Sequence, residues 1–120
     1  MNDYRLESPP ILRDFLSYHE TIKAHSQKTV DEYFLDLRNF FRYLKQSHDP
    51  SLRDLPLSEI SIMDVDPDFV KKVTLTDIYA YMTYLSRDRV QHQNSDVSDY
   101  GLNAASRARK IATIRSFYNY

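Results

Sequence analysis

The chain has 120 residues, of which 42% are hydrophobic and 28% are charged, and its formal net charge is −1. These values are ordinary for one soluble globular domain, and no apolar run approaches the roughly 18 residues that a membrane span needs. The absence of cysteine excludes disulfides and thiolate metal sites, and a single glycine, Gly101, argues against a turn-rich β-sandwich or barrel. The composition therefore predicts one all-α domain over residues 1–120, a bundle of four main helices with room for a short fifth.

The first expected helix opens at Ser8-Pro9-Pro10, because serine is a common cap and proline suits the first helical turn. We expect it to end near Ala24. Nothing before it resembles a secretory signal, so a cytoplasmic protein is the simplest interpretation. The residues that recur at helical spacing in this segment are Ile11, Leu12, Phe15, His19 and Ile22.

A second, longer helix is expected after Ser26, which is placed to cap it. Its apolar positions form the most sustained stripe in the sequence, over four turns. The stripe consists of Val30, Tyr33, Phe34, Leu37, Phe41 and Leu44. The polar residues off the stripe, which we expect to face water or a partner, are Lys28, Asp31, Glu32, Asp36, Asn39 and Arg42.

Residues 46–73 are irregular and acidic, with one short helix expected from Asp66-Pro67 through Lys72. Thr74-Leu-Thr-Asp77 is a capping arrangement that predicts a third long helix, and the polar residues 87–101 predict a loop. The apolar positions of that third helix are Leu75, Ile78, Met82 and Leu85.

The last expected helix starts near Asn103 and runs to Tyr120 without a stop signal, which suggests a piece of a longer protein. Its expected apolar positions are Ala104, Ala108, Ile111, Ile114 and Tyr118. A second face, at spacing i, i+3, i+4 and i+7, carries Ser106, Arg109, Lys110 and Thr113.

No group of residues predicts an active site, a metal site or a cofactor site. The four histidines are scattered, without a second ligand at metal spacing, and the alternating Asp64, Asp66 and Asp68 lack the glycine and closing glutamate of a calcium loop. Tyrosines beside apolar positions are better explained as core residues than as nucleophiles. They are Tyr33, Tyr81 and Tyr118.

Charge is distributed unevenly along the chain. Six acids stand against three bases between Ser47 and Val73, whereas residues 101–120 contain four bases and no acid. A helix face that carries arginine, lysine and small hydroxyls can enter a DNA major groove, where arginine pairs with guanine and the others hold phosphates. Such a face also occurs as plain solvated surface, so charge alone leaves both interpretations open.

Two segments resemble the core-binding, SAM-like N-terminal domain of tyrosine recombinases and phage integrases, most of all the integrase and Xer-type enzymes of Gram-positive bacteria. The first segment is similar to the family's Ser-x-x-Thr-x-x-x-Tyr-x-x-Asp-Leu-x-x-Phe helix, and the second to its Thr-x-x-Arg-x-Leu-Ser-x-Leu-Arg-x-Phe-Tyr helix. In this sequence they read Ser26-Gln-Lys-Thr29-Val-x-x-Tyr33-x-x-Asp36-Leu37-Arg38-x-Phe40-Phe41-x-Tyr43-Leu44 and Ser106-x-x-Arg109-Lys110-Ile111-x-Thr113-Ile114-Arg115-Ser116-Phe117-Tyr118-x-Tyr120.

The resemblance implies a domain that packs on one side of double-stranded DNA, with its own C-terminal catalytic domain, expected after residue 120, on the other side. Other recombinase protomers on the DNA are implied as further partners. The family's second and fourth helices approach the major groove. Carried over by position, the implied DNA-binding residues are Lys28, Thr29, Ser106, Arg109, Lys110 and Thr113.

The family's catalytic residues are an arginine, a His-x-x-Arg pair and a tyrosine nucleophile in the following domain. No histidine here is followed by arginine three positions on, so the chain itself is not expected to cleave or join DNA. Two departures stand out: Phe34-Leu35 replaces a basic pair that many relatives carry after the motif tyrosine, and the 46–73 connection is longer than in compact relatives.

Two other function classes remain open at this stage. A helical protein–protein module could use the aromatic residues to dock a partner subunit without binding DNA, and its binding would respond little to salt. A small enzyme complete in itself is disfavoured, because the sequence contains no constellation of titratable residues.

Overall fold

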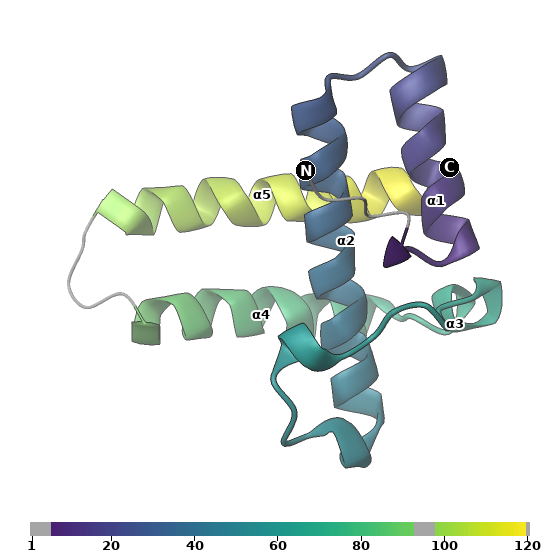
Figure 1. The fold of residues 1–120 in the computed structure, drawn as a ribbon. Coiled ribbons are helices and arrows are strands. Elements are labelled where there is room, and N and C mark those ends of the chain that lie inside the picture. The colour runs from purple at the N-terminus through teal and green to yellow at the C-terminus, as the bar shows by residue number, and fades with distance from the viewer. Residues whose placement is uncertain (1–5, 93–97, 120) are drawn as a thin grey trace. The chain divides into compact units, whose positions relative to one another are not determined.

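The computed structural model describes residues 6–92 and 98–119, and every regular element in this part is helical (Figure 1). The chain divides into two compact units, Met1–Lys72 and Val73–Asn119. The all-α prediction is confirmed, whereas a single domain over residues 1–120 stays a prediction. Within the described part, no helix combines the length and apolar character that crossing a bilayer requires.

The first unit begins with α1 (Pro10–Ser17), which continues into a π-helical turn, η2 (Tyr18–Ile22). The residue that precedes α1 is Pro9, which makes no side-chain cap, so the prediction that Ser8 caps this helix is wrong. His19 is buried, at 5% exposed, as its place in the apolar stripe predicts. Ile22 is 72% exposed, so the prediction that it continues this stripe is wrong. The wider i→i+5 turn rotates the residues that follow it away from the spacing of an α-helix.

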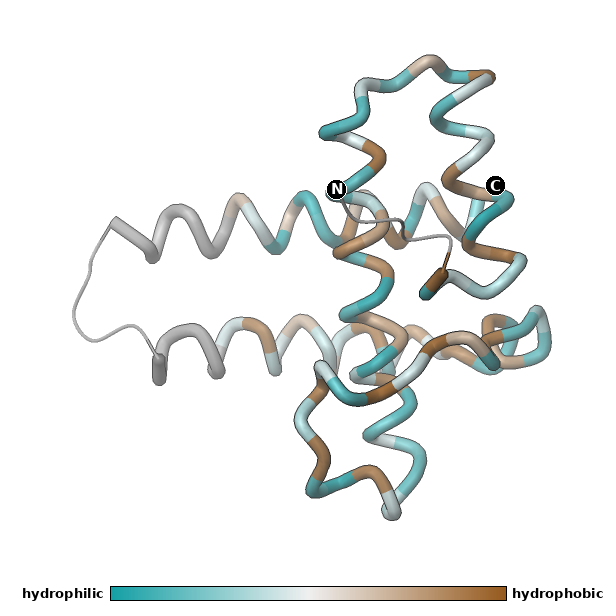
Figure 2. The backbone as a smooth tube through the Cα atoms, in the orientation of Figure 1, coloured by the Kyte–Doolittle hydropathy of each residue, from teal (hydrophilic) through white to brown (hydrophobic). Residues whose placement is uncertain are grey.

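The long helix α2 (Gln27–His48) forms the centre of the first unit. The prediction that Ser26 caps it is confirmed, because the backbone N–H of Thr29 donates to the Ser26 hydroxyl over 3.2 Å. Hydrophobic and hydrophilic residues alternate along this helix in Figure 2. Five residues of the predicted stripe are buried, while the sixth, Tyr33, is half-buried. The five are Val30, Phe34, Leu37, Phe41 and Leu44.

The buried face of α2 is wider than the predicted stripe. Phe40 is fully buried beside the stripe, and Asp36, which we expected to face water or a partner, is 1% exposed. That expectation for Asp36 is therefore wrong. The physical reason is that a helix buried along much of its length needs an apolar face broader than the narrow stripe of a two-helix contact.

The acidic connection after α2 folds as two 3-10 turns, η3 (Pro50–Leu52) and η4 (Leu57–Glu59), followed by the short helix α3 (Pro67–Lys71). The prediction of a helix at Asp66-Pro67 is confirmed, since the Asp66 carboxylate accepts from the Phe69 N–H over 2.8 Å. Four apolar side chains of the connection are buried and anchor it to its unit. They are Ile60, Ile62, Val65 and Val70.

The second unit consists of two helices, α4 (Leu75–His92) and α5 (Ser98–Tyr118). The predicted capping arrangement is confirmed: the Asp77 N–H donates to the Thr74 hydroxyl over 3.1 Å, and the Thr74 N–H donates to the Asp77 carboxylate over 2.9 Å. The prediction of a loop over 87–101 is wrong for 87–92 and 98–101, which are helical, and its remainder lies outside the described residues.

The start of the last helix near Asn103 is wrong for the same reason, because α5 begins at Ser98 and includes Gly101. No proline follows Pro67, so nothing in this polar sequence forbids a helix. One interior glycine costs about 1 kcal/mol relative to alanine, which a helix of this length tolerates.

Candidate nucleic-acid interface

The N-terminus of α2 carries two of the predicted DNA-binding residues, Lys28 and Thr29. Its first turn contains no acidic residue, Lys28 is exposed, and Thr29 is half-buried. Ser26 donates its hydroxyl to the Thr29 hydroxyl oxygen over 3.1 Å, so the cap and the adjacent threonine hold one another in place. The first N–H groups of a helix and its dipole favour a phosphate at this end.

The opposite end of the first unit has the reverse charge. Every acid in the connection after α2 is exposed, and together they are Asp49, Asp54, Glu59, Asp64, Asp66 and Asp68. Asp49 directly follows α2, whose 22 residues span about 33 Å at 1.5 Å per residue. The rest of the connection returns alongside the second half of α2, where Arg42 and Lys45 contact it. The acids nearest to Lys28 on the helix itself are Asp31 and Glu32, which are half-buried.

Side chains of α2 hold the acidic connection in place by donating to its carbonyl groups. The Arg42 Nε atom donates to the Ile60 carbonyl over 2.9 Å, and the Lys45 Nζ atom donates to the Ser61 carbonyl over 2.7 Å and to the Asp64 carboxylate. Gln46 donates to the Leu55 carbonyl over 2.9 Å. The polar residues on this half of α2 therefore serve the fold rather than a ligand.

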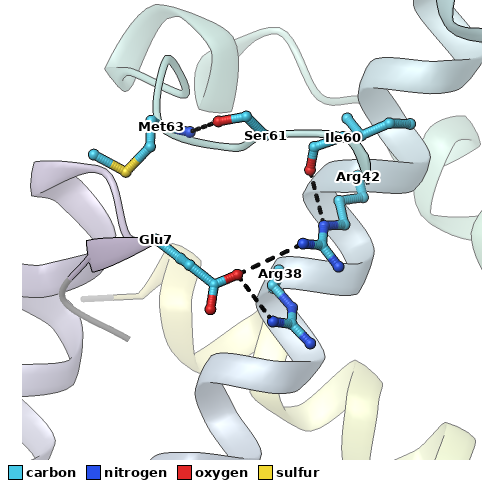
Figure 3. Close-up of polar contacts among 6 residues, drawn as sticks. All are labelled: Glu7, Arg38, Arg42, Ile60, Ser61 and Met63. Carbon is cyan, nitrogen blue, oxygen red and sulfur yellow. Dashed lines mark hydrogen bonds and ion pairs between the residues drawn. The ribbon is translucent and has the colours of Figure 1, made fainter. Parts of the chain in front are cut away.

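Glu7 completes this arrangement from the start of the chain, as Figure 3 shows. One oxygen of its carboxylate lies 3.1 Å from the Arg38 guanidinium and 3.6 Å from that of Arg42. Burial and the charge of Arg38 lower the pKa of Arg42, and the Glu7 carboxylate raises it. Arg38 and Arg42 thus both form ion pairs with one carboxylate of their own unit.

The buried face of α5 differs from the expected one. Its buried residues occur at i, i+3, i+4 and i+7, and they are Lys110, Thr113, Ile114 and Phe117. The predicted apolar face is confirmed at Ile114, which is buried, while Ile111 is half-buried. The prediction is wrong for Ala108, which is exposed, and for Tyr118, which is 38% exposed. Burial, followed by the charge of Asp77, raises the pKa of the Tyr118 hydroxyl to about 12.

The predicted DNA-contacting residues of α5 therefore separate into two groups. Arg109 is exposed and Ser106 half-buried, but Lys110 is 8% exposed and Thr113 1% exposed, with the Thr113 hydroxyl donating to the Arg109 carbonyl over 3.1 Å. The exposed face carries two arginines among small side chains, which allow a helix to approach a groove closely. It consists of Ala105, Ala108, Arg109, Ala112 and Arg115.

Arg115 was not nominated from the sequence, although it shares this face with Arg109. The signal that identifies it is the spacing of the buried residues, because Ile114 and Phe117 lie on the far side of the helix from Ala112 and Arg115. The sequence predicted that both Ile111 and Ile114 are buried, but only Ile114 is.

Two of the scattered histidines come together in the first unit. The imidazoles of His19 and His25 stack with ring centroids 5.2 Å apart and planes inclined by 23°. Within the described part of the chain, no three potential ligands converge to hold a metal ion.

Residues 12–64 match the family model for the N-terminal SAM-like domain of phage integrases. Over these residues, fewer than half of the chain, the protein is similar to that domain. The match covers most of α1, all of η2 and α2, and the connection as far as Asp64, and so contains the capped helix start with Lys28 and Thr29.

Curated relatives extend the similarity over most of the chain. Tyrosine recombinase XerC of Caldanaerobacter subterraneus is 42% identical over 115 residues, covering 96% of this chain and 30% of its own length. Tyrosine recombinase XerC of Chlorobaculum tepidum is 30% identical over 109 residues, covering 91% of this chain and 25% of its own. The chain spans less than a third of the length of these relatives. No solved structure gives a significant match.

Proposed function

We propose that this integrase-type domain is the DNA-gripping part of a site-specific tyrosine recombinase, which holds duplex DNA at the recombination site. The observation that carries the proposal is the exposure of Lys28 and Arg109 at the positions that the family resemblance assigns to DNA. The acid-free first turn of α2 and the acid-free stretch 101–120 support it, since phosphate neutralisation dominates DNA affinity.

In this proposal the residues divide by role. Arg109 reads a base edge in the major groove, while Lys28, Thr29 and Ser106 hold phosphates and fix the register of the domain. The buried Lys110 and Thr113 support the α5 face from behind. Strand cleavage through a phosphotyrosine link belongs to a catalytic domain expected after residue 120. Further protomers on the same DNA complete the assembly, which we place in the cytoplasm. The DNA-gripping role of this domain uses no cofactor or metal.

The sharpest test of the proposal is Arg109→Ala. We expect it to cost about 1–3 kcal/mol of DNA binding and to relax sequence preference at one position, measured by fluorescence anisotropy on a set of short duplexes. Arg53→Ala is a matched control, because Arg53 is also exposed but lies in the acidic connection. Equal affinities for Arg109→Ala, Arg53→Ala and the unaltered chain would remove Arg109 from the interface.

Salt dependence tests the phosphate contacts. In a titration of isotope-labelled protein with a duplex at low and moderate salt, amide shifts should concentrate near residues 26–32 and 103–116 and fade as salt rises. Lys28→Ala should weaken binding to all sequences alike and reduce the slope of log affinity against log salt by about one. An unchanged slope would place Lys28 away from the phosphates.

A protein-docking module is the second candidate, favoured by one observation on α4. Leu75 and Tyr79 lie one turn apart and are both 61% exposed, which is unusual for large apolar side chains. Binding of a protein partner through them would change little with salt. A salt-insensitive interaction that Tyr79→Ser abolishes, together with no DNA binding at low salt, would favour this candidate.

A further inference from the structure

His19 lies at the junction of three segments of the first unit. Its ring contacts Phe15 of α1 with centroids 4.4 Å apart, Tyr33 of α2 at 5.0 Å and Tyr18 of η2 at 5.2 Å, all edge to face. His25, in the turn between η2 and α2, stacks on the fourth side. The side chain is 5% exposed, so this imidazole is a packing element of the junction.

The surroundings of His19 favour its neutral form. The buried Nδ1 atom has no hydrogen-bond partner among the described residues. Burial lowers the pKa of the imidazole most, and the positive charges of His25 and Lys23 lower it further. The titratable groups that face it are Tyr18, Lys23, His25 and Tyr33, and none of these side chains stabilises an imidazolium by carrying negative charge at neutral pH.

The backbone of the same residue closes the turn that leads into α2. The His25 N–H donates to the His19 carbonyl over 2.9 Å, and this bond closes a turn in which Ala24 adopts a left-handed conformation with φ of 54°. A left-handed alanine persists only where its surroundings hold it. Ser26 follows directly and caps α2, so the turn sets the direction of the first helical turn and its Lys28.

We propose that His19 is a positioning residue for DNA binding: its neutral ring holds the 23–26 turn, and thereby Lys28 and Thr29, in the conformation that contacts phosphate, and its protonation releases that turn. The inference rests on the proposed function of α2. It predicts that the domain loses affinity for DNA in mild acid, an effect that an exposed histidine would not cause.

The sign follows from proton linkage. Because the pKa of His19 is lower in the folded junction than the ordinary value near 6.5, the loosened junction binds more protons in this range. The ordered turn is therefore fully favoured above about pH 6.5 and loses stability as pH falls toward the lowered pKa. An exposed histidine near DNA acts in the opposite direction, since it gains a positive charge and strengthens phosphate binding.

The first measurement uses the free protein and no DNA. In a pH titration followed by NMR, the His19 imidazole should titrate below about pH 6.5, and the amides of residues 23–29 should shift with the same midpoint. Amides of 23–29 that stay unmoved while His19 titrates would overturn the inference, whatever the domain binds.

The second measurement compares DNA affinity with pH in the unaltered chain and in His19→Phe, which keeps an aromatic ring and removes the titration. From about pH 7.5 to about pH 5.5, the affinity of the unaltered chain should fall relative to His19→Phe, by at most about tenfold per pH unit for one coupled proton. His48→Gln, at the exposed far end of α2, is the matched control and should follow the unaltered chain.

The outcomes separate the two proposals. Parallel pH profiles for the unaltered chain and His19→Phe, with both binding DNA, would overturn the role of His19 and leave the proposed function standing. No DNA binding by either protein at any pH would overturn the proposed function, and the amide titration of the free protein would then decide whether His19 controls the turn.

Discussion

The two long helices of the proposed interface, α2 and α5, differ in how firmly their sequences fix the buried face. In α2 the buried positions are large apolar residues, and five of the six predicted ones are buried. In α5 the predicted positions include alanines, and the observed buried face contains Lys110 and Thr113 beside Ile114 and Phe117. The spacing of apolar residues therefore predicted most of the buried face of α2 but not that of α5.

The difference follows from the size of the side chains. Burying a leucine or phenylalanine stabilises a fold by about 1.5–3 kcal/mol, and alanine contributes far less. Rotating α2 would expose several large side chains at once. In α5 the choice is between Ile114 with Phe117 on one face and Ile111 with Ala108 on another, so the spacing of apolar residues alone does not decide between them.

The largest expected effect is in the core of α2. Phe41 is fully buried, with its ring 6.2 Å from Phe69 of α3 and 5.7 Å from Phe40. Phe41→Ala should lower the free energy of unfolding by about 3–5 kcal/mol, the usual cost of a large cavity, as measured by urea denaturation. Leu35→Ala, on the same helix but 41% exposed, should change it by about 0.5 kcal/mol or less. Similar losses would mean that α2 does not bury one face.

The polar half of α2 provides a second, smaller effect. Arg42 has a side chain only 11% exposed, and Arg42→Met leaves the Ile60 carbonyl without its donor and Glu7 with one arginine fewer. The expected loss is about 1–3 kcal/mol, that of a hydrogen bond from a charged group, again by urea denaturation. Lys45→Met is the control: its two acceptors, the Asp64 carboxylate and the Ser61 carbonyl, belong to exposed residues, so these contacts contribute about 1 kcal/mol or less. A greater loss for Lys45→Met would contradict this ranking.

Local chemistry was the part of the fold that the sequence predicted best. The caps at Ser26, Asp66 and Thr74 depend only on a hydroxyl or carboxylate two or three residues from an N–H group, and all three form. The π-turn at His19 could not be predicted in this way, because its i→i+5 bonds depend on the packing of α1 against α2 rather than on residue type.

The candidate site was predicted less completely. Lys28 and Arg109 could be nominated because a capped helix start and an arginine in a family motif are local features. The burial of Lys110 and the shared face of Arg109 and Arg115 could not, since both depend on the rotation of α5 about its axis. The pairing of His19 with His25 depends on the turn that brings them together.

The smallest expected effect concerns two threonines of the second unit, and it tests which face of α5 is buried. Thr113 and Thr83 each donate a hydroxyl to the carbonyl four residues earlier, over 3.1 and 3.0 Å, but Thr113 is 1% exposed and Thr83 is exposed. Thr113→Ala should lower the free energy of unfolding by about 1 kcal/mol through the lost buried hydrogen bond and methyl group. Thr83→Ala should be neutral or stabilise by a few tenths, about the gain in helix propensity.

Because the two substitutions remove the same atoms from the same local geometry, their difference in thermal or urea stability isolates burial. A cost confined to Thr113→Ala would fix the 110/113/114/117 face of α5 as the buried one and leave Arg109 and Arg115 on the side open to DNA. If Thr113→Ala were as neutral as Thr83→Ala, the expected face of Ser106, Arg109, Lys110 and Thr113 would be open to solvent, and Lys110 and Thr113 would return to the proposed interface.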